Sequence, residues 1–307
     1  NYKNGKGFMT TALSTNRLEN VFSRYEDNTT RSGTIFQNDS YEWETKLRFL
    51  TTHYSDQWKW SSGFNIQQSS YKNNTIFSYY DIAYNTTLNF AKYGFFVKGS
   101  RKFMHDRLDL TLGLRTDGDS FSTGSNLIDN LSPRIAFSYA LTENQKWKLN
   151  ATAGRYFKIP TYTMLGFQNE RSFFVNKDAS YVRSDHLVAG LEYNLSPSSR
   201  FTLEGFVKNY SNYPVSVIDG VSGNEAIISD GKGQSSGIEF LFQQKLSNNF
   251  YGVFAYTYFF SEFTGLDQIS RPSVWDSRNL ISFTGGYKLK RNWEVSARWR
   301  FAGKNPN

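Results

Sequence analysis

Apolar and polar residues alternate along most of this chain, and residues 293–301 show the pattern most clearly. Trp293 and Trp299 occupy odd positions, whereas Glu294 and Arg298 occupy even positions. Successive side chains of an extended strand point to opposite faces, so this segment has one aromatic face and one charged face. A helix would place positions i and i+2 on opposite sides. The pattern therefore predicts a strand with lipid on one face and water on the other.

The same alternation recurs along the whole chain in segments of about ten or more residues, which is typical of transmembrane β-barrels. In 108–115, for example, four leucines alternate with polar residues. The pattern predicts an all-β, antiparallel transmembrane barrel wall of about 13 strands. These strands are expected at residues 7–27, 40–54, 57–71, 91–104, 107–117, 132–142, 146–157, 181–195, 199–215, 232–246, 249–263, 276–289 and 291–303.

The expected connections alternate between short and long. Short turns are expected at residues 55–56, 105–106, 142–145, 196–198, 247–248 and 290. Long polar loops are expected at residues 28–39, 72–90, 118–131, 158–180, 216–231 and 264–275. Short turns on one rim and long loops on the other are typical of outer-membrane barrels. We therefore expect a bacterial outer-membrane protein with extracellular long loops and periplasmic short turns.

Composition agrees with a barrel and excludes a helical membrane protein. Aromatic residues make up 18% of the chain, proline occurs only 6 times, and the mean hydropathy is −0.57. The sequence has no apolar run near the ~18 residues that a transmembrane helix needs. In a barrel only alternate residues face lipid, so a low mean hydropathy is compatible with membrane residence.

Cysteine content and charge narrow the possible functions. The chain has no cysteine, which excludes a disulfide scaffold, a thiolate metal site and a cysteine nucleophile. The net charge of +8 comes from basic residues spread singly along the strands. Nucleic-acid binding is therefore not expected. A modest basic surplus suits anionic lipid head groups, although an ordinary solvated surface explains it equally well.

Several sequence motifs resemble TonB-dependent outer-membrane receptors. Ser-Pro-Arg at 132–134 and Gly-Arg-Tyr-Phe-Lys-Ile-Pro-Thr at 154–161 are similar to one run of that family. Residues 184–193 and 231–239 resemble two of its strands, and residues 271–287 resemble a run of its Bacteroidetes-type members. Because these motifs occur in the family's order, the chain from about residue 130 onward is identified as similar to such receptors.

The resemblance implies a barrel of about 22 strands around an N-terminal plug. Residues 1–307 would form one partial barrel domain, and the plug and the final strands are expected to be missing from this fragment. The implied function is capture of an extracellular nutrient and its import with TonB-type energy coupling. The implied partners are outer-membrane lipid, the receptor's own plug, the energy complex, an unidentified nutrient and, in some receptors, a surface lipoprotein. The alternative is a passive channel or a surface-binding barrel without energy coupling.

The predicted loop 158–180 is the strongest candidate for ligand binding. Exposed aromatic rings and an arginine can stack on a ligand and donate hydrogen bonds to it. The alternative is that the same side chains pack the outer loops into a lid. No cofactor is expected. The candidate residues are Tyr162, Phe167, Arg171, Phe173 and Phe174.

No metal site is expected, because metal binding requires several ligands that converge on one point. The three histidines are widely separated in the predicted strand order, at His53, His105 and His186. Two acidic segments, Asp117-Gly118-Asp119 and Asp219-Gly220, have the oxygen ligands that calcium prefers. Asp-Gly also favours turns in any loop, and this interpretation is preferred.

No catalytic residue is expected, and the chain is predicted not to be an enzyme. The best hydrolase candidate is the run Ser184-Asp185-His186. A catalytic nucleophile, base and acid must meet in space, but adjacent strand residues point to opposite faces.

Overall fold

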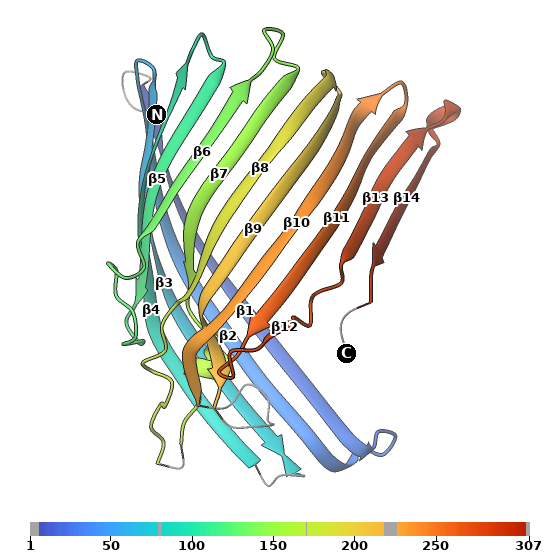
Figure 1. The fold of residues 1–307 in the computed structure, drawn as a ribbon. Coiled ribbons are helices and arrows are strands. Elements are labelled where there is room, and N and C mark those ends of the chain that lie inside the picture. The colour runs from blue at the N-terminus through green and yellow to red at the C-terminus, as the bar shows by residue number, and fades with distance from the viewer. Residues whose placement is uncertain (1–5, 79–81, 170, 218–225, 305–307) are drawn as a thin grey trace.

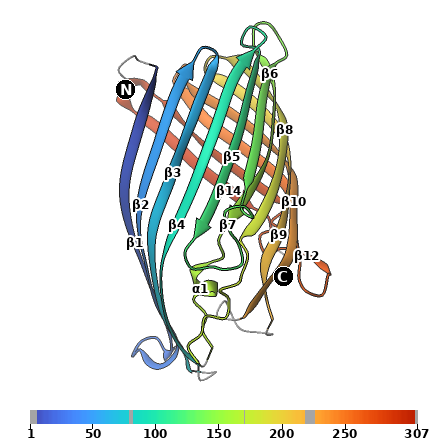
Figure 2. The same ribbon diagram turned by 90° about the vertical axis from the view of Figure 1, so that its left-hand side faces the viewer.

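The computed structural model describes residues 6–78, 82–169, 171–217 and 226–304. They form a curved, open sheet in which neighbouring strands are antiparallel and follow the order of the chain (Figure 1). The short β12 pairs with β11 and lies off this order. Figure 2 shows β10–β14 passing behind β1–β3, so the sheet curves around a central space. We call the side facing this space the lumen face.

The structure has one short α-helix, α1 (Tyr162–Leu165), and one 3₁₀ turn, Lys290–Asn292, among the described residues. The strands are β1 (Gly7–Asp27), β2 (Ser32–Ser55), β3 (Trp58–Phe77), β4 (Ile82–Phe103), β5 (Leu108–Asp119), β6 (Ser132–Ala140), β7 (Trp147–Lys158), β8 (Val182–Ser196), β9 (Ser199–Ser216), β10 (Ile227–Ser247), β11 (Phe250–Thr264), β12 (Ser270–Pro272), β13 (Asn279–Lys288) and β14 (Glu294–Ala302).

The predicted all-β, antiparallel fold is confirmed, and each expected strand overlaps one long strand of the structure. Two predicted loops were wrong over most of their length. Residues 28–39 belong largely to β2, and residues 72–90 belong largely to β3 and β4. These segments continue the ladder with polar side chains that bond across it, as Asn38 does to Thr75 at 2.7 Å. The sequence prediction required alternating apolar residues, so it missed polar strand extensions. It also missed β12.

The register assigns each side chain to a face. Trp299 pairs with Phe283 and Arg298 pairs with Thr284, so the aromatic and the charged residues of β14 lie on opposite faces. The outer face is apolar along the sheet, with Leu13 74% exposed and Ile135 44% exposed. The lumen face carries charged and hydroxyl side chains such as Glu44, Lys92 and Ser69. This is the two-sided wall that the alternation predicts. No helix among the described residues is long and apolar enough to cross a membrane.

The largest buried apolar cluster lies on the lumen face, where the segment 158–180 packs against β3 and β4. Its buried members are Tyr71, Leu88, Phe90, Leu165 and Ala179. In Figure 1, α1 lies inside the arc of the sheet, near the rim opposite the short turns. The predicted long loop therefore folds into the lumen.

The face assignment predicts different effects for two neighbouring residues of β6. Ile135 lies on the outer face, and Ala136 lies on the lumen face. Ile135→Arg is expected to destabilise the membrane-inserted receptor by about 2–4 kcal/mol, because its charge would face hydrocarbon. Ala136→Arg is expected to have a much smaller effect. Denaturant unfolding in lipid vesicles checks this, and equal destabilisation by both variants would contradict the assignment.

Candidate functional site in the lumen

The candidate site begins where β7 ends and α1 turns into the lumen. Pro160 stops the ladder, because proline has no backbone N–H to donate. Leu165 of α1 is completely buried against the wall. The carbonyl oxygen of Gly166 accepts hydrogen bonds from the Tyr84 hydroxyl and from the Thr86 hydroxyl, the latter at 2.7 Å. A side chain at residue 166 would press on the Tyr162 carbonyl oxygen and on Thr86, so glycine permits the close approach.

Tyr162 attaches α1 to three strands of the wall. Its hydroxyl donates to Glu44 Oε1 of β2 at 2.7 Å and contacts Lys92 Nζ of β4. Glu44 and Lys92 form an ion pair at 3.0 Å. Ser69 of β3 lies 3.3 Å from the Tyr162 hydroxyl, and the Tyr162 ring meets the Phe90 ring edge to face. Burial raises the pKa of Tyr162, and the Glu44 carboxylate raises it further. The phenol therefore stays protonated and acts as a donor.

The other end of the segment is held by two buried polar side chains. Asn176 donates to the Met164 carbonyl oxygen at 2.8 Å and accepts from the Ile227 backbone N–H at 2.9 Å. The Tyr181 hydroxyl donates to Asp119 Oδ2 at 2.8 Å. Tyr162 at one end of the segment and Asn176 and Tyr181 at the other end all form hydrogen bonds to strands of the wall. Residues 162–181 are therefore fixed against the wall.

The five predicted site residues occupy two kinds of position. Tyr162 and Phe174 pack into or beside the buried cluster, and Phe167 stacks on Tyr84 with ring centroids 6.0 Å apart. Arg171 is exposed, and Phe173 is 66% exposed. Three of the residues thus contribute to loop packing, and two stand open to solvent. Ligand contact by any of the five stays a prediction.

A basic lumen wall beside α1 was missed by the sequence prediction. It borders a cavity of about 340 Å³ next to the segment 158–180. Arg115 is paired with Asp117, and the Arg134 guanidinium lies 4.2 Å from the centroid of the Tyr156 ring. The only sequence signal was the recurrence of cations at lumen-facing positions of adjacent strands. The cations lining this cavity are Lys46, Arg48, Lys92, Arg115, Arg134 and Lys158.

The family model described as TonB dependent receptor-like, beta-barrel, matches residues 1–307. The chain belongs to this family. Barrels of TonB-dependent receptors sit in the outer membrane, so the apolar outer face of this sheet is the surface that a bilayer requires. No curated protein matches the chain.

Solved structures that are similar to this chain include receptors and a transporter. The pyoverdine receptor FpvA from Pseudomonas aeruginosa PAO1 has 13% identity and a TM-score of 0.72, over 99% of this chain and 49% of that one. The ferric-catecholate import receptor Fiu from K12 E. coli has 12% identity and a TM-score of 0.69, over 98% and 52%. The copper transporter OprC has 14% identity and a TM-score of 0.67, over 95% and 50%. The chain thus spans about half the length of these proteins, and the similarity shows the fold alone.

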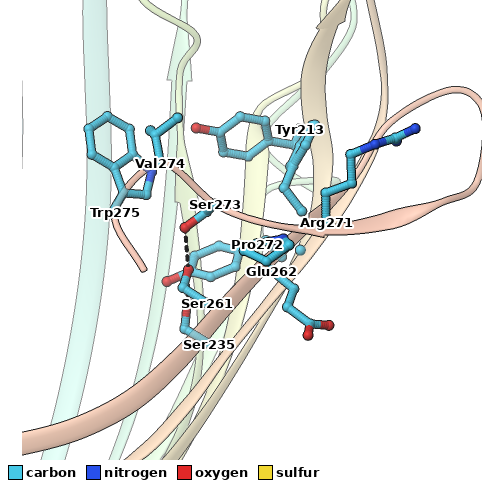
Figure 3. A pocket seen from close by; sticks show the side chains of 12 residues that line it. Tyr213, Ser235, Ser261, Glu262, Arg271, Pro272, Ser273, Val274 and Trp275 are labelled. Atoms are coloured by element: carbon cyan, nitrogen blue, oxygen red, sulfur yellow. Dashed lines mark hydrogen bonds between the residues drawn. The ribbon is translucent and has the colours of Figure 1, made fainter. Parts of the chain in front are cut away.

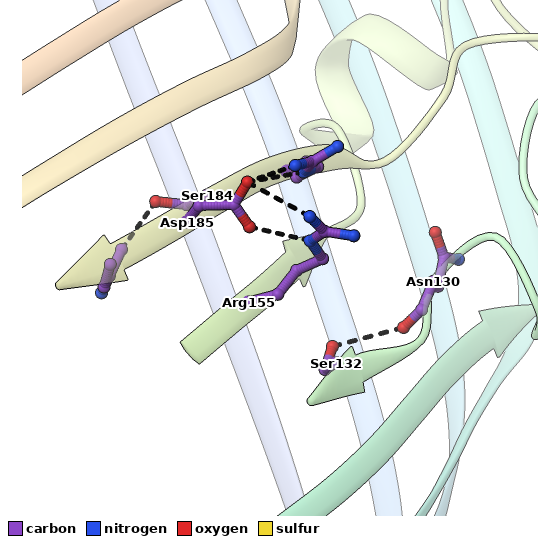
Figure 4. A network of polar contacts seen from close by, with 7 residues as sticks. Asn130, Ser132, Arg155, Ser184 and Asp185 are labelled. Carbon is purple, nitrogen blue, oxygen red and sulfur yellow. Dashed lines mark hydrogen bonds and ion pairs between the residues drawn. The ribbon is translucent and has the colours of Figure 1, made fainter. Parts of the chain in front are cut away.

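The Ser184-Asp185-His186 run does not form a catalytic triad in this TonB-dependent receptor barrel. Ser184 Oγ lies 2.6 Å from His186 Nε2, and the register places both on the lumen face. Figure 4 shows the Asp185 carboxylate pointing away from the Ser184 hydroxyl and toward Arg155. Asp185 lies on the opposite face, where Arg155 donates to it at 2.8 Å and Arg183 at 2.9 Å. Asp185 therefore does not orient the histidine, as the alternation of strand side chains predicts. The family is one of transport receptors rather than enzymes.

The acidic segment around Asp119 has structural contacts. Asp119 Oδ1 accepts hydrogen bonds from the backbone N–H groups of Phe121 and Ser122, each at 2.7 Å, which closes a turn. Asp219-Gly220 lies outside the described residues. Within the described ranges, no three histidine, aspartate or glutamate side chains gather in a way that could hold a metal ion.

The contacts of Tyr162 predict a local effect of removing its hydroxyl. A hydrogen bond to a charged group contributes about 1.5–3 kcal/mol. Tyr162→Phe is therefore expected to speed amide hydrogen exchange in residues 162–166 roughly tenfold or more, without changing exchange in β8. Tyr193→Phe is the matched control, because Tyr193 stacks on Trp147 at the outer face. Unchanged exchange in the Tyr162 variant would show that the hydroxyl does not hold the segment.

Proposed function

We propose that this chain is part of the wall of an outer-membrane receptor that captures an extracellular nutrient and imports it with TonB-type energy coupling. The observation that carries the proposal is the segment 158–180, which lies in the lumen at the rim where the long connections meet. It leaves Arg171 and Phe173 exposed. A ligand entering from this rim would meet these side chains before it could pass farther into the barrel.

The family supports a larger assembly than residues 1–307. We propose that the chain is one partial barrel domain in a wall of about 22 strands, with a plug in its lumen and an inner-membrane energy complex as partner. β1 and β14 form the two edges of the sheet, which leaves each able to pair with a further strand. The remaining parts of the proposal are extracellular long loops, lipid around the outer face, and a surface lipoprotein as an optional partner. The run at 271–287 favours a Bacteroidetes-type receptor.

A passive channel or a surface-binding barrel is the alternative function, and energy dependence distinguishes it from the proposal. Cells producing the full-length receptor are supplied with labelled ferric pyoverdine, a labelled ferric catecholate, Cu²⁺, cobalamin or neutral oligosaccharides. The proposal expects accumulation of one of these compounds, and its loss when a protonophore collapses the proton gradient. Accumulation that survives the protonophore would favour the passive channel. Surface binding without accumulation would favour the binding barrel.

The two exposed residues of the segment, together with its anchoring residue Tyr162, are expected to contribute to capture. Replacing Tyr162, Arg171 and Phe173 together with alanine is expected to weaken ligand binding by tenfold or more, because an aromatic contact and a charged hydrogen bond are both lost. The barrel should stay folded, since its strand ladder is unaltered. Ligand titration and thermal unfolding of the purified receptor check the two parts. Full affinity in the triple variant would exclude these residues from the site.

A further inference from the structure

A second pocket opens on the lumen face at the ends of β9, β10 and β11, away from α1. Its volume is about 580 Å³, within the range of small-molecule sites. Tyr210, Tyr213 and Phe263 supply aromatic rings, and the Tyr213 and Phe263 rings meet edge to face at 5.1 Å. The connection after β12 borders the pocket and contributes Val274 and Trp275 (Figure 3).

Three serine hydroxyls form a row through this pocket. Ser261 Oγ lies 2.9 Å from Ser235 Oγ and 2.9 Å from Ser273 Oγ. Ser273 is fixed in this place because its backbone N–H also donates to the Ser261 carbonyl oxygen at 2.8 Å. A hydroxyl has one donor and two acceptor positions, so a row of three keeps hydrogen-bonding capacity toward a ligand.

The charged residues bordering the pocket interact with other groups. Arg271 pairs with Asp267 at 2.7 Å. Glu262 accepts a hydrogen bond from Ser270 at 3.0 Å, and Figure 3 shows its carboxylate pointing away from the serine row. The pocket therefore offers a ligand aromatic rings and neutral hydroxyls. In this respect it differs from the basic wall beside α1.

Trp275 gives the pocket an open aromatic surface. Its side chain is 69% exposed, and the neighbouring Val274 is 62% exposed. A large ring held in water at the edge of a concave pocket is a typical contact surface for a ligand with an apolar face. Tyr213, on the other side of the connection, supplies a second ring in Figure 3. A ligand between them could stack on a ring and reach the serine row.

We propose that this pocket is a subsite for an uncharged saccharide. A sugar ring presents a face of C–H groups that packs on an aromatic ring, and its hydroxyls exchange hydrogen bonds with serine hydroxyls. An anionic ligand would lose its hydration here. The cation among the described lining residues, Arg271, is already paired with Asp267. Saccharide binding at this pocket does not depend on the proposed function. Only the further step, that the saccharide is the imported nutrient, rests on it.

The test is calorimetric titration of the purified full-length receptor in detergent. The probes are the neutral trisaccharides maltotriose, cellotriose, mannotriose and xylotriose, with trigalacturonate as a charged counterpart. At least one neutral probe is expected to bind more tightly than trigalacturonate. Trp275→Ala and Tyr213→Ala are each expected to weaken that binding roughly tenfold, because each removes an aromatic contact. Trp275→Phe keeps a ring and is expected to restore most of the affinity.

Trp293→Ala is the matched control, because Trp293 is also 69% exposed but lies at the short turn before β14, away from the pocket. Its affinity for the neutral probe should equal that of the unaltered receptor. The proposal is overturned if no neutral trisaccharide binds, if trigalacturonate binds equally well, or if Trp275→Ala keeps full affinity. Binding in detergent requires no energy source. Binding without energised uptake would therefore refute only the proposed function, and energised uptake without trisaccharide binding would refute only the subsite.

Discussion

The whole structure depends on the backbone ladder that joins each strand to its neighbours. Backbone polar groups inside a bilayer have no water to bond with, so the strands must pair with each other. The same ladder fixes the register, and a shift of one residue would move every side chain to the opposite face. The pairs Phe283–Trp299 and Thr284–Arg298 show the result, because aromatic and polar side chains fall on opposite faces in step on β13 and β14.

A wall of this kind has no apolar interior of its own, because its lumen face is polar. Leu88 and Phe90 of β4 are apolar residues at lumen positions, and the segment 158–180 covers them. At this part of the wall, buried apolar side chains therefore mark where the segment docks. Once Leu165 is buried there, the polar groups around it must also be satisfied, and Tyr162 and Asn176 provide the required hydrogen bonds. Packing and hydrogen bonding together position the candidate site.

Sequence reasoning predicted the strands and their faces because alternation is a local property. It failed at residues 32–39 and 72–77, where runs of polar residues interrupt the apolar alternation although the strands continue. Sequence reasoning could not predict that the segment 158–180 folds into the lumen, because the Tyr162–Glu44 contact joins residues 118 positions apart. The serine row was missed for the same reason, because Ser235, Ser261 and Ser273 come together only through the register and the course of the connection after β11.

The two proposed lumen sites favour ligands of different charge. Beside α1, Lys92 and Arg115 are each bonded to a carboxylate, so the field there is weaker than the number of cations suggests. It remains a basic surface, and an anion placed on it would gain ion pairs in exchange for its hydration. At the β9–β12 pocket the same anion would lose hydration and find hydroxyls and rings. A neutral ligand has little hydration energy to lose and can use the apolar rings. If both proposed sites bind ligand, we expect the two parts of the wall to select by charge, which a lumen of uniform polarity would not do.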